Sequence, residues 1–98
     1  MNAIIEVSSS NYGSGFIVHN WNLKVTDKGR ETSFYLGQDV KFCSRVLGMT
    51  GRQVAEEIGS SDLTIEKTRY RLARFIIDTL ELTEEQLFEL QPWELCCQ

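Results

Sequence analysis

The segment that most constrains this 98-residue chain is the stretch 50–74, TGRQVAEEIGSSDLTIEKTRYRLAR. Thr50, with Gln53 three residues later, forms a capping box, which predicts the start of a helix. Gly59 then offers the left-handed conformation in which helices commonly end. Ser61 is a residue type that caps a following helix. The sequence therefore predicts two helices joined by a tight turn, which is a helix-turn-helix.

The second predicted helix, expected to run to about Leu80, separates apolar and basic side chains onto opposite sides. At 100° per residue, one stripe is apolar and faces inward: Ile65, Leu72, Ile76 and Leu80. Arginine reads guanine edges, lysine contacts phosphate, and hydroxyls and N–H groups at a helix start bind anions. The predicted DNA-contacting residues are Ser60, Ser61, Thr64, Lys67, Tyr70, Arg71 and Arg74. The simpler interpretation is a solvated charged face, which is common on surface helices.

The spacing within this stretch resembles the helix-turn-helix of LuxR/GerE-type regulators and of sigma-factor region 4. The matching residues are Val54, Ala55, Ile58, Gly59, Ser61, Thr64, Ile65 and Arg71. The resemblance implies that the segment 62–74 is a recognition helix. It also implies that a last helix mediates dimerisation. Ser60, Glu66 and Arg69 depart from the family pattern.

The charge of the chain is acidic overall but unevenly distributed. The formal net charge is −4, with a pI of about 4.9, which counts against nonspecific coating of nucleic acid. Residues 41–74 carry seven basic and four acidic side chains, whereas 78–98 carry six acidic side chains and no basic one. This pattern favours a sequence-specific, DNA-binding transcriptional regulator, expected to be a homodimer. The alternative is an adaptor that binds RNA polymerase, a sigma factor or another regulator, favoured by the acidic balance and by Glu66.

The N-terminal third is expected to be β-structure. β-branched and aromatic runs predict three strands: Ala3–Val7, Phe16–Val25 and Thr32–Leu36. The segment 8–15 has the composition of a loop, and Gly29 suits a hairpin turn that requires a positive φ. Trp21 and Phe34 either cover the helical core or belong to a hairpin that pairs with a second copy of the chain.

The predicted fold class is α+β. A β-hairpin or small antiparallel sheet (1–37) precedes a three- to four-helix helix-turn-helix bundle (38–98), together forming one compact unit. A scaffold helix is expected from Asp39 to about Leu47, with Cys43 on its buried side. A capping box of Thr83 and Gln86 predicts a last, acidic helix, which either dimerises or completes the core.

Several functional classes find no support in the sequence. Its one histidine, His19, lies in a predicted strand, so we expect neither an enzyme nor a cofactor or metal site. Cys96 and Cys97 are adjacent and lack the C-x-x-C spacing of zinc and redox motifs, although oxidation of this pair offers a route to cross-linked chains. No apolar run is long enough to cross a membrane, and no secretion signal is recognisable, which favours the cytoplasm.

Overall fold

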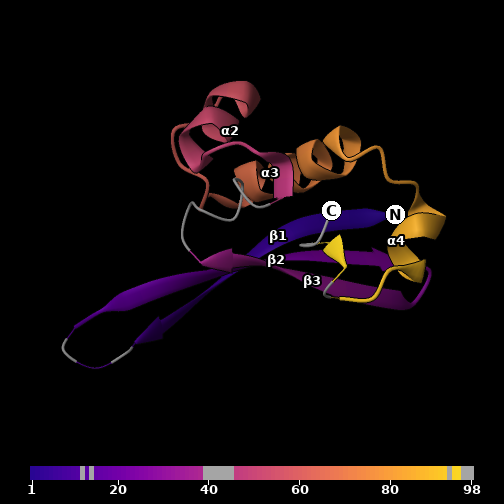
Figure 1. Cartoon of the computed structure of the whole chain (residues 1–98), viewed down its shortest axis with the longest axis horizontal. Helices are drawn as coiled ribbons and strands as arrows, with labels where there is room; N and C mark the ends of the chain where they lie inside the picture. Colours follow the sequence, from indigo (N-terminus) through magenta and orange to yellow (C-terminus); the bar gives the residue numbers. More distant parts are fainter. Residues whose placement is uncertain (12, 14, 39–45, 93, 96–98) are drawn as a thin grey trace.

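A computed structural model describes residues 1–11, 13, 15–38, 46–92 and 94–95 of the chain. Within these residues, three strands and three helices form two layers, with the helices on one face of the sheet (Figure 1). In chain order the elements are β1 (Asn2–Asn11), β2 (Ile17–Asp27), β3 (Arg30–Gln38), α2 (Gly51–Ile58), α3 (Glu66–Thr79) and α4 (Glu84–Glu89).

The strands form an antiparallel sheet in the order β1-β2-β3, as the sequence predicted for the N-terminal part. Gly29 takes the expected positive φ of 84°, after Lys28 at 48°, so a two-residue turn joins β2 to β3. β1 continues beyond Val7 to Asn11, through residues expected to be a loop. Cross-strand hydrogen bonds such as that from Asn20 Nδ2 to Ser10 Oγ accompany this pairing, which overrides the loop-like composition.

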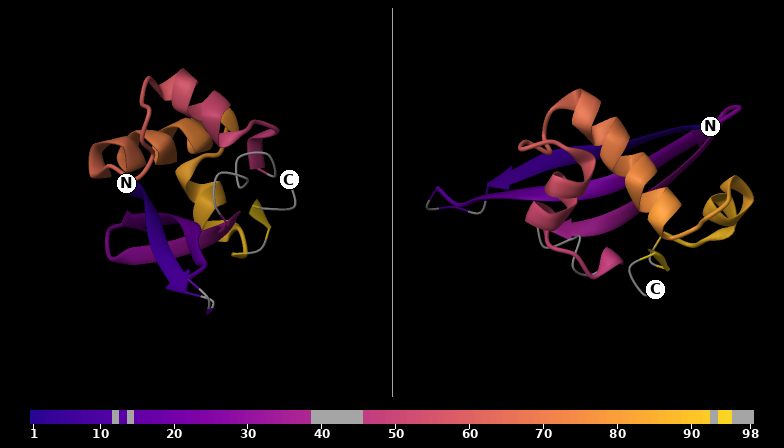
Figure 2. Two further views of the ribbon diagram at one scale, coloured as in Figure 1. Left: turned by 90° about the vertical axis from the view of Figure 1, so that its left-hand side faces the viewer. Right: turned by 90° about the horizontal axis from the view of Figure 1, so that it is seen from above.

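The prediction of a three- to four-helix helix-turn-helix bundle is wrong. The described residues form three helices: α3 packs against β1, α4 against β3, and α2 against α3 (Figure 2). One hydrophobic core joins both parts. Its buried sheet residues are Ile5, Trp21, Leu23, Val25, Phe34 and Leu36. Because this apolar sheet face must be covered, the apolar side of α3 packs on it instead of closing a bundle.

The start of the second predicted helix is also corrected. α3 begins at Glu66, and the seven residues 59–65 separate it from α2, in place of a tight turn. Asp62 Oδ1 accepts hydrogen bonds from the Thr64 backbone N–H, at 2.9 Å, and from its hydroxyl, at 2.6 Å. Such local bonds compete with a helix. Ile65, predicted to face inward, therefore lies before α3 and is 52% exposed.

Both predicted capping boxes are confirmed. Thr50 and Gln53 exchange hydrogen bonds at the start of α2, and Thr83 and Gln86 do so at the start of α4. α4 folds back onto the sheet, where Leu87 is fully buried, so it completes the core. The expected scaffold helix has residues 39–45, with Cys43, outside the described part of the chain, and Cys96 and Cys97 also lie outside it.

Candidate functional site: the hairpin arm and the cleft at its base

The predicted basic stripe lies on the exposed side of α3. Lys67, Arg71 and Arg74 are all exposed, on the opposite side of the helix from the buried Leu72 and Ile76. Figure 2 shows that neither the sheet nor α4 covers the outer side of α3. This side therefore remains accessible within the part of the molecule that the structure describes.

The arginines of α3 also make contacts within the protein. Arg71 donates a hydrogen bond to the backbone oxygen of Ile58, at the C-terminal end of α2. Arg69 donates to the backbone oxygen of Ile5 at 3.1 Å, which satisfies a carbonyl of the edge strand β1. Arg74 Nη1 lies 3.9 Å from Asp78 Oδ1, so these two exposed side chains form an ion pair. Two of the three cations in the stripe thus have partners that a DNA duplex would have to share or replace.

Of the other predicted contact residues, Tyr70 neighbours this stripe on α3, whereas the three hydroxyl residues lie before the helix. Ser60, Ser61 and Thr64 belong to the α2–α3 linker. Ser60 Oγ lies 3.0 Å from the Thr68 hydroxyl, a buried side chain of α3. Tyr70 is 40% exposed and borders a small hollow of about 260 Å³ beside β1, together with Arg69. The structure therefore divides the seven residues between two places, the α2–α3 linker and the exposed side of α3.

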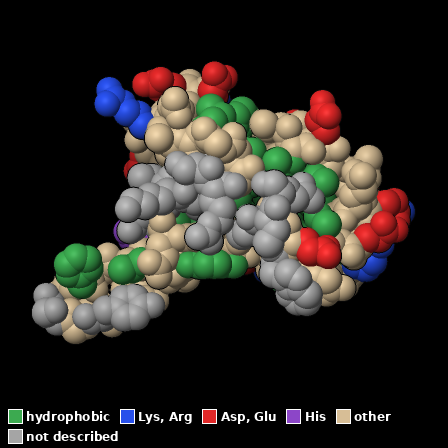
Figure 3. Space-filling view, in the orientation of Figure 1, with side chains coloured by type: hydrophobic (Ala, Val, Ile, Leu, Met, Phe, Trp, Pro, Cys, Tyr) green, Lys and Arg blue, Asp and Glu red, His purple; other side chains and the backbone are tan. Residues whose placement is uncertain are grey.

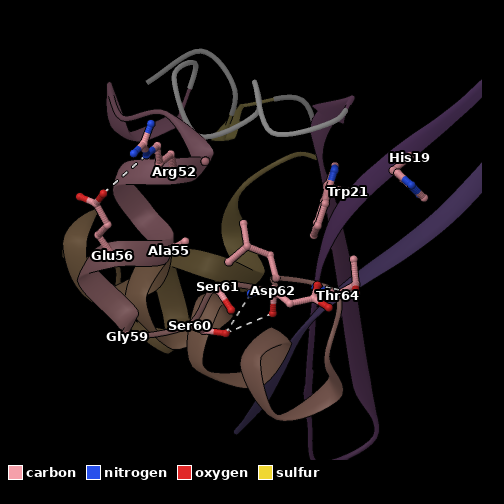
Figure 4. A pocket seen from close by; sticks show the side chains of 12 residues that line it. His19, Trp21, Arg52, Ala55, Glu56, Gly59, Ser60, Ser61, Asp62 and Thr64 are labelled. Carbon is pink, nitrogen blue, oxygen red and sulfur yellow. Dashed lines mark hydrogen bonds and ion pairs between the residues drawn. The ribbon is translucent and has the colours of Figure 1, made fainter.

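The linker serines and Thr64 line a cleft of about 910 Å³ between β2 and α2. Figure 4 shows Arg52 and Glu56 of α2 on one side, His19 and Trp21 of β2 on the other, and the linker between them. The lining residues are His19, Trp21, Gly51, Arg52, Ala55, Glu56, Gly59, Ser60, Ser61, Asp62, Leu63 and Thr64. A cleft of this size accommodates a small molecule or one or two large side chains.

The cleft combines an apolar floor with a polar rim. Trp21 and Leu63 are almost completely buried and contribute their accessible edges to the floor. On the rim, Arg52 and Glu56 form an exposed ion pair at 3.7 Å. Hydrogen bonds from the Thr64 hydroxyl, and then from its N–H, hold the pKa of Asp62 below its usual value. Asp62 therefore carries a negative charge at neutral pH, which disfavours phosphate at this point.

A two-stranded arm projects from the sheet beside the cleft. Its strands continue beyond the last β2–β3 pair, Asn20 with Gln38, and among the described residues they pair with each other as far as Asn11 with Ile17. We call the paired segments 9–11 and 17–19, together with Phe16, the arm. Phe16, whose N–H donates to the Gly13 oxygen at 3.0 Å, is 70% exposed near its tip, and the adjacent Ile17 is 60% exposed.

The arm is free of formal charge. From Val7 to Leu23 the sequence contains no Asp, Glu, Lys or Arg, in a chain of which 24% is charged. Figure 3 shows hydrophobic side chains on the arm, while acidic side chains gather over the helical layer and around α4. This absence of charge can be read from the sequence. The projection of the segment from the sheet cannot, because its serines and glycines predict an ordinary loop.

Comparison with protein-family models, curated proteins and solved structures gave no match to this chain. The resemblance to LuxR/GerE-type regulators and sigma-factor region 4 thus stays a prediction. Among the described residues, no group of three or more His, Cys, Asp or Glu side chains is placed to hold a metal ion. Within the same residues, no helix has the length and apolar character needed to cross a membrane.

Proposed function

We propose that this chain is a protein-binding module that contacts its partner through the arm. The observation that carries the proposal is the exposure of Phe16 and Ile17, 70% and 60%, at the end of an uncharged two-stranded ribbon. Of the large hydrophobic side chains in the described residues, these two are the most exposed. Burial in a partner would remove this apolar surface from water.

The edges of the arm support the same conclusion. Strand edges that stay in water are usually protected by lysine, proline or inward-pointing charge, because unprotected edges pair with other chains. The arm has none of these residues, whereas Arg69 covers part of the β1 edge within the body of the sheet. The absence of charged side chains and the presence of an exposed aromatic residue, Phe16, are features of the centre of a protein–protein interface.

A photo-crosslinking experiment tests this proposal. A photoreactive phenylalanine analogue replaces Phe16 in one variant and Tyr70, an exposed aromatic residue of α3, in a control variant. Irradiation of cells that produce each variant should yield a protein adduct from position 16 and little or none from position 70. Absence of any protein adduct from position 16, or equal yields from both positions, would contradict the proposal.

Sequence-specific DNA binding is a second candidate, because the basic stripe of α3 is exposed. It ranks below protein binding because Arg71 and Arg74 have internal partners, Asp62 is ionised beside the linker hydroxyls, and the chain carries a net charge of −4. Selection from random duplex DNA at low salt tests this candidate. It predicts an enriched motif, weaker binding for Lys67→Ala, and affinity that falls steeply with salt. No enrichment at low salt would eliminate it.

A further inference from the structure

We infer that the partner of the arm is a second copy of this chain, with Phe16 of each copy seated in the cleft of the other. The inference rests on the proposed protein-binding function and identifies its occupant. It is carried by three observations: the position of the cleft, the distribution of charge, and the match between the arm tip and the cleft floor.

The cleft lies where a second arm would end. A two-fold contact uses the same surface on both copies. In the arrangement that we infer, the two-fold axis is perpendicular to the arms, so the two arms lie side by side and run in opposite directions. The tip of each arm then lies beside the base of the other. His19 and Trp21, at the base of the arm, also line the cleft. From Ile17 to Trp21 the strand spans about 13 Å, so two overlapping arms bring each tip to the partner's cleft.

The charge distribution favours contact between identical copies at this surface. Two chains of net charge −4 repel each other, and the repulsion is weakest where neither surface is charged. The arm provides such a surface, because the run from Val7 to Leu23 contains no formal charge. The cleft rim carries the Arg52–Glu56 pair, which is locally balanced, and Asp62, which lies in the linker. Of the surfaces described above, the arm and cleft therefore oppose self-association least.

The arm tip and the cleft floor are chemically complementary. The floor presents Trp21, Leu63 and Ala55, and its volume of about 910 Å³ accepts a phenylalanine side chain with a neighbouring isoleucine. Trp21 is 3% exposed, so only a small part of its side chain is available for the offset or edge-to-face contact that aromatic rings favour. The cleft hydroxyls of Ser60, Ser61 and Thr64, assigned to DNA by sequence alone, form the polar border of this contact.

The experiment measures the mass of the purified full chain by sedimentation over a range of concentrations. Two variants disable the two halves of the contact separately. Phe16→Asp places a charge on the arm tip, and Ser61→Arg obstructs the cleft. Ser33→Arg, on the exposed sheet face away from the helices, is the matched control for the second variant. Phe16 and Ser61 are both exposed, so neither substitution removes core packing.

We expect the natural chain and Ser33→Arg to form dimers, and each disabling variant to dissociate. The expected weakening is at least about tenfold for each Phe16, and on the order of a hundredfold for a dimer with two. Mixing Phe16→Asp with Ser61→Arg should partly restore association, because the mixed pair keeps one intact arm and one intact cleft. Circular dichroism checks that each variant is folded, and either variant alone decides the outcome.

The result that overturns the inference is a monomeric natural chain at all concentrations, or dimerisation of either folded disabling variant as tight as that of the natural chain. The crosslinked product at position 16 separates this failure from failure of the proposed function. An adduct with a different protein would leave protein binding standing and end the self-association inference. No protein adduct would end both.

Discussion

Substitution of Arg71 tests whether this residue on the outer side of α3 stabilises the fold or is available to bind a ligand. Its guanidinium donates a hydrogen bond to the Ile58 oxygen, one of the carbonyls at the C-terminal end of α2 that lack a partner within the helix. The DNA-binding hypothesis requires that Arg71→Ala leaves folding intact. The structure instead requires that the substitution detaches the end of α2 from α3 and lowers the free energy of unfolding.

The expected loss follows from the geometry of this bond. A hydrogen bond from a charged donor contributes about 1.5–3 kcal/mol, and partial exposure of Arg71 reduces this to about 1 kcal/mol. Arg74→Ala is the matched control, because it removes only an exposed ion pair at 3.9 Å. Such a pair contributes at most about 0.5 kcal/mol. The change in helix propensity is the same for both substitutions, so it cancels in the comparison.

The assay is urea unfolding and thermal unfolding of the two variants, followed by circular dichroism at 222 nm. The two substitutions should differ by about 0.5–1 kcal/mol, so Arg71→Ala should unfold with a Tm lower than that of Arg74→Ala by about 2–8 °C, since 1 kcal/mol shifts Tm by about 4–8 °C in a domain of this size. Equal midpoints, or a lower midpoint for Arg74→Ala, would refute the structural role of Arg71 and return it to the candidate ligand contacts.

Two further substitutions test other parts of the fold. Gly59 ends α2 at φ 70°, and an added Cβ would meet only Arg71 Nη2, at 3.8 Å. Gly59→Ala should therefore lower the free energy of unfolding by about 1 kcal/mol through backbone strain, and Gly59→Asn should lower it less. Equal urea midpoints for the two variants would contradict this. A hydrogen bond between the two carboxyls raises the pKa of Glu84 and lowers that of Asp27 to about 2. The raised pKa of Glu84 gives stability that is present at low pH and lost as pH rises through its folded pKa. Glu84→Gln keeps a hydrogen-bond donor to Asp27 at all pH values, so its Tm minus that of the natural chain should grow from about pH 4 to pH 7. A difference in Tm that does not change with pH would refute the hydrogen bond between the Glu84 and Asp27 carboxyls.

The local features of the chain were predictable because each depends on residues within one turn of one another. The capping boxes at Thr50 and Thr83 and the positive φ of Gly29 and Gly59 all follow from short-range hydrogen bonding and steric freedom. The start of α3 was not predictable from Ser61, because Asp62 binds Thr64 and holds the linker out of the helix. A helix start after Ser61 and a helix start at Glu66 both satisfy local rules. The structure has the start at Glu66, and the linker residue Leu63 then packs into the core.

The candidate site was predicted only in part, for the same reason. Helical periodicity was sufficient to place Lys67, Arg71 and Arg74 on one exposed stripe. It could not reveal that Arg71 closes the end of α2, because that bond joins residues thirteen positions apart. The cleft was missed entirely, since β2 on one side and α2 with the α2–α3 linker on the other are about thirty to forty residues apart in sequence and meet only in the folded chain.

By itself the sequence determined three antiparallel strands, the helix caps at Thr50, Gly59 and Thr83, and a segment of seventeen residues, 7–23, without formal charge. Tertiary structure alone decided that the helices cover the sheet, that Ile65 faces solvent, and that the uncharged segment projects as an arm beside a cleft. The physical reason is that burial of apolar surface has no preferred direction along the chain. Which apolar faces meet depends on all the elements together, whereas a cap or a turn depends only on its neighbours.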